Sequence, residues 1–278
     1  MKYTRNKFLK LTALAIPGAA TAAVTSSFTQ APTKDDAALN LAVASYTFRK
    51  FNLDNTIRMS KRLGINDISL KDFHMPLNSS AAEIKAIAQK VKDAGMNLYG
   101  AGVIYMKTPE EVNSIFDYAA NAGLNMIIGV PNHELLAMVN EKVQSTNIRL
   151  AIHNHGPGDK LYTSPDNVYE NIKDLDKRIG FCIDIGHVQR IGQDPCTMLE
   201  KYKDRLFDMH MKDVSSSTAD GSPVEIGHGV INIPKVIKTL KKIKYKGHVC
   251  FEYEKDGEDP LAGFAESVGY VRGVMKVV

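Results

Sequence analysis

From Asn40 onward the sequence alternates about eight times between short apolar segments typical of strands and longer segments with helical spacing. This rhythm predicts a parallel sheet whose strands are connected by helices, and eight such units close a (β/α)8 barrel of roughly 250 residues. A doubly wound sheet is the main alternative, but no glycine-rich phosphate fingerprint follows the first strand. We therefore predict an α/β fold, a single-domain (β/α)8 TIM barrel over residues 40–278, with strands expected at 41–47, 67–71, 97–103, 126–130, 148–154, 180–184, 206–211 and 248–253.

Capping residues mark where most of the intervening helices begin. Ser79 or Ser80 should cap a helix that Gly95 ends, and Asp54 should cap the first helix. Proline in the first turn gives four more expected starts. These are Thr108-Pro109, Ser164-Pro165, Asp194-Pro195 and Asp259-Pro260. The chain after Asp184 is expected to be a loop.

The N-terminus has the layout of a secretory signal peptide. A positive head is followed by an apolar, alanine-rich run from Leu11 to Val24; the head contains Lys2, Arg5, Lys7 and Lys10. The head also resembles a twin-arginine export signal, except that Asn6 stands where the second arginine belongs, so the export route stays open. We predict a signal peptide at 1–24, a linker at 25–39 and an exported, periplasmic protein without a membrane span.

Charge and cysteine content exclude two further classes. Four of the 35 basic residues lie within the first ten positions, so the rest of the chain carries 31 basic and 31 acidic residues. A neutral body gives no electrostatic reason to bind nucleic acid or an anionic membrane. Three cysteines are an odd number, which excludes a complete disulfide framework.

Strand parity indicates where the chemistry lies, because side chains alternate along a strand and the active site of such a barrel is at the carboxyl ends of its strands. In the last four strands the large apolar side chains share one parity and should pack under the outer helices. The opposite parity carries one polar side chain per strand to the inner rim: His153, Asp184, His210 and Glu252.

Two carboxylates and two imidazoles would be unstable as a bare cluster. A divalent cation explains them, because carboxylates and neutral histidines are its ligands and its charge offsets theirs. We predict one divalent ion held by His153, Asp184, His210 and Glu252; mixed nitrogen and oxygen ligation suits Mn, Co, Zn or Mg.

These residues lie in motifs that resemble the xylose isomerase-like TIM barrels, the group of sugar phosphate isomerases/epimerases. The motifs are Asp-x-Gly-His at 184–187, His-Met-Lys-Asp at 210–213, Gly-His-Gly at 227–229, and Gly247 before the strand of Glu252. The resemblance covers nearly everything from Asn40 onward. It implies that Asp184, His210 and Glu252 are metal ligands and that His187 contacts the substrate. The family usually has Glu-Asn-His on the fifth strand, whereas this chain has His153-Asn154-His155, which puts symmetric epimerisation in doubt.

The expected function is a divalent-metal-dependent sugar isomerase/epimerase-like enzyme that abstracts a proton next to the carbonyl of a non-phosphorylated sugar. Glu252 is the first candidate base and His153 or His155 the next, while His187 would orient the substrate or protonate a leaving oxygen. Side chains expected to contact the sugar are Lys71, His74, Lys107, His187 and Lys212.

Three other functions stay open. One is a lyase that eliminates the aglycone from 3-keto-glycosides, a second is an abasic-site endonuclease-like enzyme, and a third is a non-catalytic sugar-binding protein. The expected partner is a small carbohydrate, and assembly into a homo-oligomer is left open. The segment 213–229 is either a lid or a flexible surface loop, and the lysine-rich stretch 238–246 is expected to be a solvated face.

Overall fold

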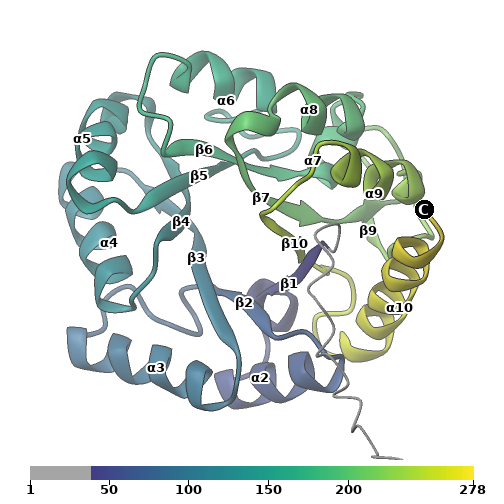
Figure 1. Ribbon diagram of the computed structural model, residues 1–278, viewed down its shortest axis with the longest axis horizontal. Coiled ribbons are helices and arrows are strands. Elements are labelled where there is room, and N and C mark those ends of the chain that lie inside the picture. The colour runs from purple at the N-terminus through teal and green to yellow at the C-terminus, as the bar shows by residue number, and fades with distance from the viewer. Residues whose placement is uncertain (1–38) are drawn as a thin grey trace, which may run out of the picture. The chain divides into compact units, whose positions relative to one another are not determined.

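The computed structural model describes residues 39–278 and contains a closed barrel of parallel strands in the order β1-β10-β7-β6-β5-β4-β3-β2 (Figure 1). This confirms the predicted (β/α)8 barrel. The signal peptide and the linker, apart from Leu39, lie outside the described residues. The barrel strands are β1 (Asn40–Ala44), β2 (Asp67–Leu70), β3 (Asn97–Met106), β4 (Met126–Pro131), β5 (Arg149–His153), β6 (Ile179–Asp184), β7 (Leu206–Met211) and β10 (His248–Phe251).

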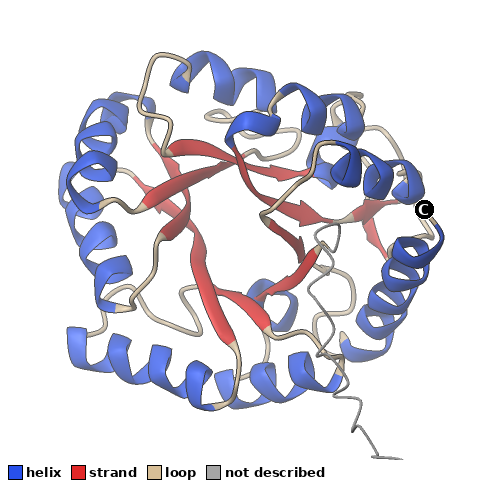
Figure 2. Cartoon of the chain, in the orientation of Figure 1, coloured by secondary structure: helices blue, strands red, loops and turns tan. Residues whose placement is uncertain are grey.

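Helices surround the strands as an outer ring (Figure 2). They are α2 (Leu53–Arg62), α3 (Ala81–Asp93), α4 (Pro109–Asn121), α5 (Leu136–Thr146), α6 (Pro165–Ile172), α7 (Ile185–Arg190), α8 (Pro195–Lys201), α9 (Ile233–Lys242) and α10 (Leu261–Val277). Short 3-10 turns lie at η1 (Ser45–Phe48), η2 (His133–Leu135) and η3 (Lys203–Arg205). Within 39–278, no helix has the length and apolarity that crossing a bilayer requires.

Most of the predicted caps are observed. Ser80 forms a capping box with Glu83, and Thr108 and Ser164 cap α4 and α6. The cap predicted for the first helix is wrong: Asn52 caps α2, with its side chain accepting a 3.0 Å hydrogen bond from the Asn55 N–H. Asp54 lies in the first turn instead, where its carboxylate favours the positive end of the helix dipole.

Two segments expected to be loops have regular structure. The chain after Asp184 forms the short helix α7, because the Asp184 side chain accepts a 2.9 Å hydrogen bond from the His187 N–H. The segment 213–229 contains the hairpin β8 (Asp213–Val214) and β9 (Pro223–Val224). Asp213 is fully buried and accepts hydrogen bonds from the N–H groups of Gly227 and Gly229, at 2.9 and 3.0 Å, which ties this segment to the end of β7.

The inner face of the barrel has small and polar side chains as well as apolar ones. Cys182 and Cys250 are buried and free. Asp208 is also fully buried there, and the Tyr99 hydroxyl donates a 3.1 Å hydrogen bond to it.

Candidate metal centre

The four residues predicted as metal ligands come from four neighbouring strands and lie at the same end of the barrel. His153 and Asp184 are the last residues of β5 and β6, His210 lies near the end of β7, and Glu252 directly follows β10. All four side chains are buried. Strand parity explains this arrangement, since each side chain points into the barrel while its neighbours pack outward.

Each of the four contributes one nitrogen or oxygen, and these atoms all lie within 4.8 Å of one another. His210 Nδ1 lies 3.2 Å from His153 Nε2 and 3.1 Å from Glu252 Oε2. Asp184 Oδ2 lies 3.6 Å from His153 Nε2. The potential ligand atoms therefore converge on one small volume.

The donors fit a divalent cation. Asp184 Oδ2 is buried and makes no hydrogen bond, although ion-pair partners surround it. A carboxylate oxygen that faces imidazole nitrogens across this small volume lies in a ligand position, with the Lys212 ammonium as its present ion-pair partner. Glu252, Asp184 and His210 could thus hold an ion together with His153, the residue that replaces the family's usual glutamate.

A buried ammonium group lies against the same carboxylates. Lys212 is 3% exposed, and its Nζ lies 3.0 Å from Asp184 Oδ2, 2.9 Å from Glu252 Oε2 and 3.1 Å from Glu254 Oε2. Burial alone would lower the pKa of Lys212, but the carboxylates, first Asp184 and then Glu252, raise it well above its usual value. The site thus contains a permanent positive charge of its own.

The histidines of the cluster differ in pKa. Burial lowers the pKa of His153 to about 4, against the opposing effect of Asp184, and burial likewise lowers the pKa of His187 to about 4. For His210 the effect of burial is outweighed by Glu252, and its pKa is raised to about 9. The pKa of Glu252 is held well below its usual value, because Lys212 and His210 outweigh burial. At neutral pH and with no ion bound, His153 and His187 are therefore neutral imidazoles, whereas His210 is protonated beside the ionised Glu252 and would give up its proton to bind a metal.

His155 and His187, predicted as catalytic residues, lie beside the ligand cluster. The ring of His155 is 4.7 Å from that of His153 and 5.9 Å from that of His187. His155 Nε2 lies 3.1 Å from the Tyr105 hydroxyl. Gly156 permits this packing, because a Cβ at that position would lie 2.8 Å from His187 Nδ1.

The predicted sugar contacts are scattered more widely. Lys212 and His187 lie in the cluster, but Lys71 donates to the Val103 carbonyl and Lys107 is exposed. His74 is buried, and its Nε2 lies 2.8 Å from the Phe51 carbonyl oxygen and 3.1 Å from the Thr56 hydroxyl. The contacts of Lys71 and His74 are thus internal ones, and their role toward a sugar stays a prediction.

Three residues of the site were not predicted. Glu254 pairs with Lys212, and its parity, two residues after Glu252, was the available signal. The Asn154 side chain binds the backbone of Asp184: its Oδ1 accepts a 3.0 Å hydrogen bond from the Asp184 N–H. Asp208 lies two residues before His210 on β7, and burial raises the pKa of Asp208 to about 6. Its parity, which is the same as that of His210, was the available signal, and the fold brings it close to His210 and Cys250.

Comparison with known proteins places this chain in a family. Inosose dehydratase from Lacticaseibacillus casei is 25% identical over 137 residues, which are 44% of this chain and 45% of that protein. The chain thus matches less than half the length of this curated relative.

Two solved structures share the fold. The IOLI protein with a bound zinc atom superposes with a TM-score of 0.70 at 14% identity, over 86% of this chain and 99% of that one. The 3-keto-D-glucoside 4-epimerase YcjR from E. coli gives a TM-score of 0.67 at 14% identity, over 85% of this chain and all of that one. Residues 57–274 match the family described as xylose isomerase-like TIM barrel. The chain therefore belongs to the xylose isomerase-like TIM barrel family.

Proposed function

We propose that this protein is a divalent-metal-dependent enzyme that removes a proton next to the carbonyl group of a small, non-phosphorylated sugar. The observation that carries the proposal is the convergence of His153, Asp184, His210 and Glu252 within 4.8 Å at the carboxyl ends of four strands. Relatives named for a dehydratase of inosose and an epimerase of a 3-keto-glucoside support it, because both names specify a keto substrate.

The roles of the side chains follow from their charges. A divalent ion held by the four ligands would polarise the substrate carbonyl and make the adjacent C–H acidic. Glu252 accepts that proton, since Lys212 and His210 keep its carboxylate ionised. His187 orients the substrate or protonates a leaving oxygen, and His153 or His155 is the alternative base. Lys212 balances negative charge that develops on the substrate.

Elimination is the second candidate, and His153 favours it. The family's epimerases use two metal-bound glutamates, one on each face of the sugar, to remove and return the proton. This chain has an imidazole at the first of these positions and a carboxylate, Glu252, at the second. A single carboxylate base with imidazoles beside it suits isomerisation or loss of a leaving group after proton removal, rather than symmetric epimerisation. Incubation with a 3-keto-glucoside separates the two: a released aglycone identifies a lyase, and an isomerised or epimerised sugar identifies the first proposal.

Deuterium exchange tests the shared first step. In D2O with Mn, Co, Zn or Mg, the protein should catalyse the exchange of deuterium into a keto-sugar substrate, at the carbon next to the carbonyl. Asp184→Ala should abolish exchange, whereas Asp174→Ala, an exposed carboxylate after α6, should leave it unchanged. Sugar binding that Asp184→Ala leaves intact, without exchange by either protein, would instead identify a sugar-binding protein. Nicking of abasic DNA would identify a nuclease.

We also propose that the protein is exported to the periplasm, on the strength of the positive head and apolar run in residues 1–24. Phosphorylated sugars are cytosolic metabolites, so export favours a non-phosphorylated substrate. N-terminal sequencing of the protein recovered from the periplasmic fraction tests this: the mature chain should begin near residue 25, and an intact Met1 in the cytosolic fraction would contradict it.

A further inference from the structure

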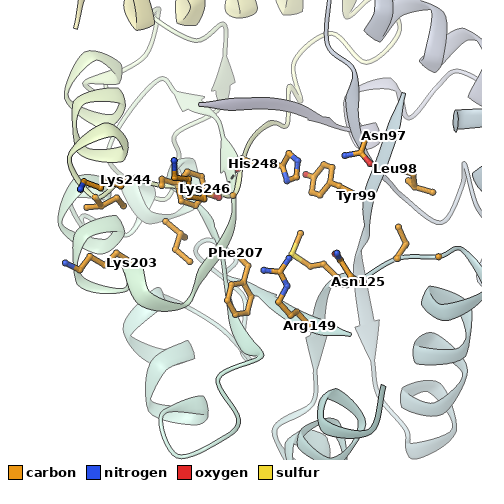
Figure 3. Close-up of a pocket in the computed structure, with 17 residues that line it drawn as sticks. Asn97, Leu98, Tyr99, Asn125, Arg149, Lys203, Phe207, Lys244, Lys246 and His248 are labelled. Carbon is orange, nitrogen blue, oxygen red and sulfur yellow. Dashed lines mark hydrogen bonds between the residues drawn. The ribbon is translucent and has the colours of Figure 1, made fainter. Parts of the chain in front are cut away.

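A pocket of about 510 Å³ lies at the opposite end of the barrel from the metal centre. It is lined by the residues at which several strands begin, among them Asn97 of β3, Arg149 of β5 and His248 of β10, and by the loop between α9 and β10 (Figure 3). The volume is in the range of small-ligand sites. No role assigned above to the metal centre involves these residues.

The lining of this pocket is basic. It includes Arg149, Lys203, Lys244, Lys246 and His248, and no aspartate or glutamate. Asp67, which borders it, lies 3.3 Å from His248 Nε2 and accepts a 2.6 Å hydrogen bond from Asn97. Within the described part of the chain, the side chains of Arg149, Lys203 and Lys244 make no ion pair or hydrogen bond. Three positively charged side chains therefore line the pocket without an ion-pair or hydrogen-bond partner among the described residues, in a chain whose body is neutral.

The Arg149 side chain is held in place within the pocket. It is half-buried, and its guanidinium carbon lies 5.0 Å from the centre of the Phe207 ring, a cation–π contact that restricts the side chain. In Figure 3 the guanidinium points toward Tyr99 and His248, whose rings are stacked with their centres 3.7 Å apart. Lys203 and Lys244 are exposed and stand on another side of the pocket (Figure 3). A planar donor held in place is suited to an oxyanion, and the lysines add positive charge from the far side of the pocket.

We propose that this pocket is a binding site for a divalent oxyanion, a phosphate or sulfate group, either free or as a monoester. The guanidinium presents paired N–H donors that match two oxygens of such a group, while lysine acts as a point charge that adapts to the rest. A monovalent anion would leave most of the positive charge uncompensated. The last part of the lysine-rich stretch 238–246, which the sequence suggests is only a solvated face, thus supplies one wall of a site through residues 243–246 of the loop after α9.

This proposal is independent of the chemistry at the other end of the barrel. Phosphate can also bind metal ions, so any observed anion binding has to be assigned either to the candidate metal centre or to the basic pocket. Asp184→Ala removes a proposed metal ligand and should leave the basic pocket intact. A 1:1 complex that survives Asp184→Ala and is lost in Arg149→Gln belongs to the basic pocket.

The experiment is a calorimetric titration of the full chain with sodium phosphate and sodium sulfate, at an ionic strength held constant with sodium chloride. Glucose 6-phosphate and glucose 6-sulfate form a second pair of ligands, and acetate is the monovalent control. We expect a 1:1 complex with the divalent anions and none with acetate. Binding of the free anions identifies an inorganic ligand, and binding of the esters alone identifies a sugar monoester.

Variants assign the complex to its residues. Arg149→Gln should weaken binding at least tenfold, and Lys203→Gln, an exposed position where folding is not at risk, about threefold. Arg58→Gln makes the same change of charge on the exposed face of α2 and should bind like the unmodified protein. The proposal is overturned if chloride competes as well as phosphate, or if Arg149→Gln and Arg58→Gln bind the anions equally.

Discussion

Lys212 brings a buried positive charge into the candidate metal centre. Its ammonium lies within 3.1 Å of three carboxylates, two of which belong to the proposed metal ligands Asp184 and Glu252. Without it, a buried cluster with three negative charges would be compensated by His210 alone when no ion is bound. Lys212 therefore stabilises the metal-free site and opposes a second cation placed beside the same oxygens.

Replacing Lys212 with methionine should make the fold depend on metal. Removing one partner from a buried ionic cluster costs roughly 3 kcal/mol or more, which in a chain of this size lowers the melting temperature by about 10 °C without metal. Added divalent ion should restore more stability to Lys212→Met than to the unmodified protein, because no ammonium then repels it. Differential scanning calorimetry with and without each ion measures both effects. Lys107→Met, an exposed position after β3, is the matched control, and equal metal responses of the two variants would contradict this account.

The convergence of the four proposed metal ligands was predictable from residue order, whereas the buried ion pairs of Lys212 were not. Parity decides which side of a strand a side chain leaves, and His153, Asp184, His210 and Glu252 followed from it. The position of a lysine ammonium group depends on the charges that other strands bring close to it. Glu252 and Glu254 are 40 and more residues away from Lys212 along the chain, so the sequence indicated a lysine that contacts the sugar but not its buried ion pairs.

Among the helices, α6 and α8 are joined by one carboxylate. Asp166, in the first turn of α6, accepts hydrogen bonds from the Lys201 ammonium at 2.6 Å, from Gln193 at 2.9 Å and from the Tyr202 hydroxyl. Partial burial acts to raise the pKa of Asp166, but these donors, Lys201 first, lower it below its usual value. The folded state therefore favours the ionised form more than the unfolded chain does.

Asp166→Asn should destabilise the protein at neutral pH by about 1 kcal/mol, a value kept small because the Asp166 side chain is 37% exposed. A carboxylate whose folded pKa is depressed contributes stability above the unfolded value of about 3.9, and loses it as the pH falls through the folded pKa. The difference between variant and unmodified protein should therefore shrink below about pH 4. Urea unfolding at pH 7 and pH 3.5 measures it, with Asp174→Asn as the control. A difference that grows on acidification would contradict the linkage.

The elements of the barrel were predictable to within a few residues, except where a side chain changes the local hydrogen bonding. Helix α7 has six residues, too few for an apolar period to show, and it forms because Asp184 caps it. Asp184 could be recognised as the polar end of a strand, but its second oxygen acts as a cap only in the folded geometry. The cap of α2 was misplaced by two positions for a related reason, since Asn52 and Asp54 are both good caps by type.

At the scale of the whole barrel, the proposed ligands are unevenly distributed. They come from β5, β6, β7 and β10, which are neighbours in the closed sheet, while β1, β2, β3 and β4 supply none. An ion at this site would cross-link one half of the barrel wall. The stability that the ion adds should therefore be distributed unevenly as well.

Removal of metal should lower the global stability of the protein and loosen that half of the wall first. An ion at a hundred times its dissociation constant adds about 2.7 kcal/mol, which corresponds to a rise of roughly 5–10 °C in melting temperature. Hydrogen exchange, compared between chelated and metal-loaded protein, should show greater protection on loading in β5, β6, β7 and β10 than in β2, β3 and β4. Asp184→Asn should abolish both the shift and the asymmetry. A uniform gain in protection around the barrel would mean that the ion binds elsewhere. A melting temperature that none of Mn, Co, Zn and Mg changes would mean that the protein binds none of these ions.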